Sequence, residues 1–136
     1  PVEADAALGS VAGQGAQAAM MIMPGGLPGS TNLSADETLR RMIADADAAG
    51  VPLSAICAAP MVYGRMGLLK GVRVTCYSGF ETELEGAVVD QVPVVVDGRF
   101  TTGWGPGAAF DFAFAIVERF CGQEKVKELK SGMRVY

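Results

Sequence analysis

Histidine is absent from the 136 residues of this chain, and cysteine is scarce. The three cysteines, Cys57, Cys76 and Cys121, are widely spaced and form no CxxC pair. Zinc sites need clustered Cys and His ligands, and disulfide-rich folds need paired cysteines, so both classes are excluded. Without histidine, a Cys-His catalytic pair within this chain is excluded as well. This cysteine usage fits a reducing compartment best, so we expect a cytoplasmic protein without a metal site.

Positive charge is also limited: the chain has 11 Lys and Arg residues against 15 Asp and Glu residues, so its formal net charge is -4. The basic residues are scattered, except for a small group near the C-terminus that suits the end of a last helix. Nucleic acid is not an expected partner, because phosphate binding needs a concentrated basic surface. No apolar run reaches the roughly 18 residues that span a membrane, so no membrane partner is expected either.

What the chain does have is a high apolar content, since half of its residues are hydrophobic. The length suits one domain with a large core. Two short apolar runs, 18–23 and 51–56, are typical of strands buried on both faces of a parallel sheet. Between them we expect a loop and then an amphipathic helix, with Ser34 as its N-cap and Gly50 as its stop. A further helix is expected after residue 60. This alternation predicts a doubly wound α/β domain over residues 1–136.

The second half adds a third strand, at 72–76, and then a change of pattern. Asp97-Gly98 separates two apolar runs and predicts an antiparallel hairpin. The longest helix should follow and end at Gly122, with a last helix over 123–133. Phenylalanines and a valine recur along one side of the longest helix, and we expect this stripe to pack on the sheet rather than to hold a cofactor. Its members are Phe110, Phe114, Val117 and Phe120.

Cys57 is the candidate nucleophile because of its position. It directly follows the second strand and precedes Ala58, Ala59 and Pro60, so the turn into the next helix must be tight. Ligands of open α/β sheets collect at the carboxyl ends of the strands, where a helix N-terminus favours a thiolate and free N–H groups can hold an oxyanion. The alternative is a buried, inert cysteine.

Glycine-rich turns end two other strands, at 24–29 and 103–107, and both should face the same crevice. The first lacks the Gly-Lys-Ser/Thr of a phosphate loop, and we expect no bound cofactor. Cys76, within a strand, and Cys121, at a helix end, lack such a turn and are expected to be structural.

Five short segments match one known pattern. They are Met23-Pro24-Gly25-Gly26, Ala55-Ile56-Cys57-Ala58-Ala59-Pro60, Cys76-Tyr77-Ser78-Gly79-Phe80-Glu81, Val95-Val96-Asp97-Gly98, and Gly105-Pro106-Gly107 with Phe110-Asp111-Phe112-Ala113. In order and spacing they resemble the ThiJ/PfpI superfamily, and within it the branch of the parkinsonism-associated protein deglycase. The match covers nearly the whole chain, from Met20 to Leu129.

This resemblance implies a flavodoxin-like three-layer α/β sandwich that forms a homodimer. It implies glutathione-independent conversion of methylglyoxal, deglycation of early glycation adducts, and protection against oxidative stress. Cys57 would attack an aldehyde, with main-chain amides among Gly25, Gly26 and Ala58 holding the oxyanion. Under peroxide Cys57 would be the first site to reach sulfinic acid. The alternative functions are a non-catalytic redox sensor or chaperone, or a structural domain with a silent cysteine.

The sequence departs from the family in three ways. The family begins with a strand-helix-strand block that would precede Pro1 and is missing here. That block carries the glutamate that acts as general acid and base beside the family's cysteine. We therefore expect the domain to be N-terminally incomplete and the missing segment to be a partner of this chain. Tyr77 stands where many members have histidine, and Trp104 where members of the human type have arginine. With Pro106, these two residues are candidate pocket residues. The acidic residues after Tyr77 do not match the missing glutamate; they are Glu81, Glu83 and Glu85.

Overall fold

A computed structural model of the chain describes residues 2–136. Pro1 lies outside the described residues, and so does the expectation about the start of the domain. The helices are α1 (Leu8–Val11), α2 (Gly29–Ala35), α3 (Glu37–Ala48), α4 (Pro60–Gly64), α5 (Ala109–Cys121) and α6 (Gln123–Met133), with 3-10 turns η1 (Ala12–Gln17), η2 (Glu81–Glu83) and η3 (Pro106–Ala108). The strands are β1 (Met21–Met23), β2 (Leu53–Ile56), β3 (Arg73–Val74), β4 (Val88–Val89), β5 (Val94–Asp97) and β6 (Phe100–Gly103).

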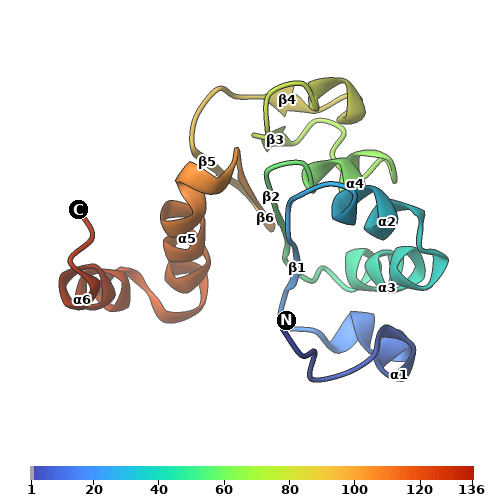
Figure 1. Ribbon diagram of the computed structural model, residues 1–136, viewed down its shortest axis with the longest axis horizontal. Coiled ribbons are helices and arrows are strands. Elements are labelled where there is room, and N and C mark those ends of the chain that lie inside the picture. The colour runs from blue at the N-terminus through green and yellow to red at the C-terminus, as the bar shows by residue number, and fades with distance from the viewer. Residues whose placement is uncertain (1) are drawn as a thin grey trace.

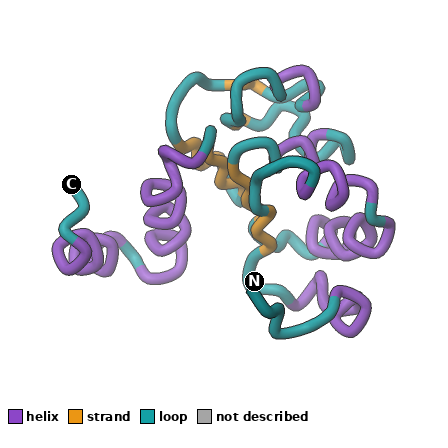
Figure 2. Tube along the Cα trace, in the orientation of Figure 1, coloured by secondary structure: helices purple, strands orange, loops and turns teal. Residues whose placement is uncertain are grey.

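The main sheet has four strands in the order β1-β2-β6-β5. β1 pairs with β2 and β2 with β6 in parallel, whereas β5 and β6 form the antiparallel hairpin that Asp97-Gly98 predicts. Figure 1 shows α2, α3 and α4 on one side of this sheet and α5 on the other, and Figure 2 shows the same layers by element type. The predicted three-layer α/β sandwich with a mostly parallel sheet and a hairpin is confirmed.

The core lies between the sheet and the helices α3 and α4. Met21, Leu53 and Phe100 stand in register on that face of the sheet and belong to one buried cluster with Ile43 of α3. Tyr63 of α4 is fully buried in the same cluster, and its hydroxyl donates to carbonyl oxygens of the chain at β1 and β2. The β-sheet and this layer therefore form the rigid base on which the strand ends are held.

The helix after β1 begins differently from the prediction. Ser34 is not an N-cap but lies inside the short helix α2, in the region predicted as a loop. Asp36 caps α3 instead, because its backbone is extended and its carboxylate accepts a hydrogen bond of 2.8 Å from Leu39 N. The prediction of Ser34 as the N-cap is therefore wrong; Asp36, an equally good capping residue two positions later, takes this place.

The third predicted strand does not join the main sheet. Residues 72–76 contribute only β3, which pairs in parallel with β4. β6 already has β2 on one edge and β5 on the other, so no edge of it is free for β3. The N–H of Thr75 instead donates to the side-chain oxygen of Thr102 on β6, at 2.9 Å. The segment that follows β3 is thereby held close to the carboxyl end of the main sheet.

The prediction that the aromatic stripe of α5 packs on the sheet is wrong for two of its members. Phe110 and Phe120 are 54% and 51% exposed, whereas Phe114 is buried and Lys130 of α6 lies over its ring. The residue pressed against the sheet is Phe112, which lies 3.2 Å from the position of an added Cβ on Gly103. α5 therefore contacts β6 through Phe112, a residue outside the predicted stripe.

Candidate active site at Cys57

Cys57 sits at a strained turn directly after β2. Its φ of 66° lies in the left-handed region, which costs a non-glycine residue roughly 1–2 kcal/mol. Two main-chain hydrogen bonds hold it there: Cys57 N donates to Gly103 O at 2.8 Å, and Tyr77 N donates to Cys57 O at 2.9 Å. The residue is half-buried. Strain maintained in this way is typical of a functional turn.

Gly25, after β1, packs directly against this turn. A Cβ added at Gly25 would lie 2.6 Å from Cys57 Cβ, 2.9 Å from Ile56 O and 3.4 Å from Cys57 Sγ. No side chain larger than hydrogen fits there without moving the main chain. The sequence Pro-Gly-Gly after β1 is thus the local reason why the thiol can lie against the end of the neighbouring strand.

Two main-chain N–H groups near the thiol are free of protein acceptors. Among residues 2–136, the N–H groups of Gly26 and Ala58 make no hydrogen bond, although Ala58 is a buried residue. Free amides beside a nucleophile can hold a developing oxyanion, as the resemblance implies for these two residues. Ala59 N donates to Ile56 O at 3.1 Å, so the third amide of the turn is already used.

The three candidate pocket residues lie together in a cleft of about 370 Å³. Tyr77 is 49% exposed and Trp104 is 38% exposed, and a Cβ added at Gly105 would lie 3.2 Å from the Tyr77 ring. The complete lining is Cys76, Tyr77, Ser78, Gln91, Trp104, Gly105, Pro106 and Gly107. Cys57 does not line this cleft, but it is joined to it through the hydrogen bond from Tyr77 N.

The acidic residues after Tyr77 take different roles. Glu81 accepts a hydrogen bond of 2.7 Å from Gly79 N, and Glu83 forms an ion pair with Arg65, with 2.7 Å between Arg65 Nε and the carboxylate. The hydrogen bond from Arg65 lowers the pKa of Glu83. Among residues 2–136, no hydrogen bond joins Cys57 to Glu81, Glu83 or Glu85, whose carboxylates have the other partners named here or none.

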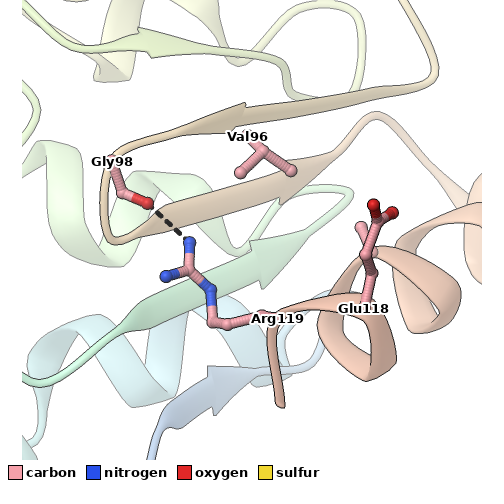
Figure 3. Close-up of a pocket in the computed structure, with 5 residues that line it drawn as sticks. Val96, Gly98, Glu118 and Arg119 are labelled. Carbon is pink, nitrogen blue, oxygen red and sulfur yellow. Dashed lines mark hydrogen bonds between the residues drawn. The ribbon is translucent and has the colours of Figure 1, made fainter. Parts of the chain in front are cut away.

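A separate hollow of about 480 Å³ lies between the β5-β6 hairpin and α5 (Figure 3). Val96 and Gly98 line it from the hairpin, and Glu118 and Arg119 from the helix. Arg119 donates to Gly98 O at 2.6 Å, which ties the helix to the hairpin turn. None of the candidate site residues lines this hollow.

Reasoning from the sequence missed two features of the site. Gln91 reaches the cleft from the segment between β4 and β5, and no local pattern marks it. Cys76 lies just beyond β3, is buried, and lines the cleft, although its strand-like context pointed to a purely structural residue.

Within residues 2–136, no helix is long and apolar enough to cross a membrane, and no group of three or more His, Cys, Asp or Glu residues is placed to hold a metal ion.

Comparison with known proteins identifies the family and the fold of the chain. The DJ-1/PfpI family model matches residues 1–119. The protein dj-1beta of Drosophila melanogaster is 35% identical over 118 residues, which are 85% of this chain and 63% of that protein. The glutathione-independent glyoxalase DJR-1.2 of Caenorhabditis elegans is 33% identical over 112 residues, 81% of this chain and 59% of that protein. The chain thus spans about three fifths of the length of these curated relatives.

The crystal structure of Drosophila melanogaster DJ-1beta superposes on this fold with a TM-score of 0.92 and 32% identity, over 99% of this chain and 73% of that one. This confirms the flavodoxin-like fold that the motifs imply. Because the family model matches most of the sequence, the chain belongs to the DJ-1/PfpI family.

Proposed function

We propose that this protein acts on small reactive carbonyl compounds, with methylglyoxal or early glycation adducts as substrates and Cys57 as the nucleophile. The observation that carries the proposal is the turn at Cys57, where a strained cysteine lies beside free main-chain amides. The similarity to a relative named as a glutathione-independent glyoxalase supports the same chemistry.

In this proposal the thiolate of Cys57 adds to the aldehyde carbon of methylglyoxal and forms a hemithioacetal. The aldehyde oxygen becomes an oxyanion and accepts hydrogen bonds from the amides of Gly26 and Ala58. A proton then moves from the former aldehyde carbon to the neighbouring ketone carbon, which gives a thioester of lactate. Water hydrolyses the thioester, so that lactate leaves and the thiol is restored. Tyr77, Trp104 and Pro106 would bound the space in which the rest of the substrate lies.

The test is lactate formation from methylglyoxal by the full-length protein and its Cys57→Ser variant. We expect the variant to lose the activity, because a hydroxyl at this position is a far weaker nucleophile than a thiolate. Cys121→Ser is the matched control, because Cys121 is exposed at the end of α5, away from the cleft, and its loss should leave the rate unchanged. Equal rates for wild type and Cys57→Ser would remove Cys57 from the mechanism.

The proton transfers in this scheme need an acid/base group that residues 2–136 do not place at Cys57. We infer that a carboxylate comes from a further segment, one that corresponds to the part of the relatives that this chain does not match. We also infer that this segment pairs with β1. β1 is an outer strand of the sheet, so the main-chain groups along its outer side are available to a further strand. Intact mass and N-terminal sequencing of the native protein test this; a single species beginning at Pro1, without a companion peptide, would contradict it.

The homodimer and the cytoplasmic location that the resemblance implies stay predictions. So does the alternative of a redox sensor or chaperone, in which the thiol of Cys57 is oxidised but performs no turnover. Mass spectrometry after mild peroxide treatment, run beside the lactate assay, separates the two functions: oxidation of Cys57 without any carbonyl turnover would favour the sensor.

A further inference from the structure

A second thiol lies next to Cys57 at the same sheet edge. Cys76 follows β3, is 7% exposed, and forms part of the cleft beside Tyr77 and Trp104. Nothing in the carbonyl chemistry proposed above uses it. The third cysteine, Cys121, is exposed at the end of α5.

The main chain brings Cys57 and Cys76 within reach of each other. The hydrogen bond of 2.9 Å from Tyr77 N to Cys57 O joins the carbonyl of one cysteine to the amide that directly follows the other. With standard bond lengths and angles, each Cα lies about 2.4 Å from the bonded O or N, so the two Cα atoms are less than about 8 Å apart. Disulfides have Cα separations of about 4.4–6.8 Å, which fall within this limit.

The electrostatics are consistent with this proximity. Burial raises the pKa of the Cys76 thiol to about 11, and the negative charges of Glu81 and Cys57 add to the increase. A charge on Cys57 acts on Cys76 in this way only when the two groups lie close together. At neutral pH Cys76 is thus mostly a protonated thiol.

We propose that Cys76 is a resolving cysteine, which captures the oxidised form of Cys57 as an intramolecular disulfide. In the first step the Cys57 thiolate attacks a hydroperoxide, the O–O bond breaks, and Cys57 sulfenic acid forms together with an alkoxide or hydroxide that takes a proton from solvent. In the second step Cys76 loses its proton to solvent, its thiolate attacks the sulfenic sulfur, an S–S bond forms, and hydroxide leaves and is protonated to water. Two thiols are oxidised and one peroxide is reduced; a small dithiol reverses the disulfide by exchange. The proposal rests on the reactive Cys57 of the proposed function and adds a regulation to it.

The high pKa of Cys76 gives this step a distinct pH dependence. Only the thiolate attacks, and its fraction rises about tenfold per pH unit below the pKa. At pH 7 the capture is slow, so that further peroxide competes and drives Cys57 on to sulfinic acid. At pH 9 we expect the disulfide to form about a hundredfold faster, since two pH units separate the conditions.

The experiment treats the full-length protein with three equivalents of hydrogen peroxide at pH 7, 8 and 9, because sulfinic acid formation consumes two, then blocks free thiols and maps peptides without reduction. We expect a peptide that links Cys57 to Cys76, in a yield that rises with pH and is removed by dithiothreitol. In Cys76→Ser we expect no linked peptide and more sulfinic acid at Cys57, because nothing captures the sulfenic acid. Cys121→Ser should behave as wild type.

Two further results decide the matter. If wild type and Cys76→Ser reach sulfinic acid at Cys57 at equal rates at pH 9, with no linked peptide, Cys76 is not a resolving thiol. Thermal unfolding shows whether Cys76→Ser and Cys76→Ala are folded. One folded variant of the two is enough for the test. Lactate formation by the reduced wild-type protein separates this proposal from the proposed function: turnover that depends on Cys57, without any disulfide after peroxide treatment, would overturn the resolving role alone.

Discussion

The substitution Gly25→Ala tests whether close packing at the end of β1 holds the turn of Cys57. The new methyl carbon would lie 2.6 Å from Cys57 Cβ and 2.9 Å from Ile56 O. Carbon atoms pack best at about 3.5–4.0 Å, so the first contact is too short by about 1 Å. Neither neighbour can rotate away, because Cys57 Cβ is fixed by its own main chain and Ile56 belongs to β2.

The main chain must therefore shift, and overpacking of this kind costs about 1–3 kcal/mol. Taking about 2 kcal/mol and a urea dependence of about 2 kcal/mol per molar, the midpoint of unfolding should fall by about 1 M with the slope unchanged. The alkylation rate of Cys57, measured against that of Cys121 in the same sample, should also change, because the sulfur lies 3.4 Å from the new methyl position.

Gly29→Ala is the matched control, four residues along the same loop. A Cβ added at Gly29 meets no atom within 4 Å, and this glycine opens α2, where alanine is a better helix former. Its midpoint should stay level or rise slightly. If Gly25→Ala unfolds at the wild-type midpoint and leaves the alkylation of Cys57 unchanged, close packing at Gly25 does not hold the turn and this reasoning is refuted.

Three further predictions concern the base on which the site is held. Tyr63→Phe removes the buried hydroxyl that bonds to two carbonyls of the sheet, and should lower the free energy of unfolding by about 1–1.5 kcal/mol in urea. Burial raises the pKa of Tyr63, so wild type should lose stability as the pH rises above about 10, where unfolded tyrosine ionises, while Tyr63→Phe should lack this part of the loss. Asp36→Ala removes the cap on Leu39 N and should cost about 1 kcal/mol, measured in the same way; no change would assign the cap to another group. Because Arg65 lowers the pKa of Glu83, this carboxylate stabilises the fold above about pH 4.3 and the effect is lost as the pH falls further. Glu83→Gln should therefore lower the free energy of unfolding by about 0.5 kcal/mol at pH 7, given the partial exposure of the pair. Near pH 3 the variant and wild type should be equally stable. An equal difference in stability at both pH values would contradict this prediction.

Local chemistry was sufficient to predict most elements of the fold. The apolar runs at 18–23 and 51–56 contain β1 and β2, and Asp97-Gly98 turns the β5-β6 hairpin, because each signal depends only on neighbouring residues. The place of β3 depends on strands far along the chain. β6 is already paired on both edges, a fact that residues 72–76 do not encode.

The candidate site divides in the same way. The end of the apolar run at 51–56 and the small residues after it are enough to predict the turn at Cys57. The glycine-rich segment 24–29 likewise predicts a turn after the first strand. The side-by-side position of Cys57 and Cys76 arises from one long-range hydrogen bond, from Tyr77 N to Cys57 O. Nineteen positions separate the two cysteines, and no periodicity relates residues at that distance, so the sequence pattern left Cys76 as a structural residue.

The two proposals depend on the same restraint of the main chain. Gly103 O accepts from Cys57 N, and Tyr77 N donates to Cys57 O, so the cysteine is fixed on one side by β6 and on the other by the segment after β3. The first bond holds the turn that carries the free amide of Ala58, which the proposed carbonyl chemistry uses. The second bond holds Cys76 beside Cys57, as disulfide formation requires. Substrate turnover and redox protection thus become alternative fates of one thiol, and the one that prevails depends on whether aldehyde or peroxide reaches Cys57 first.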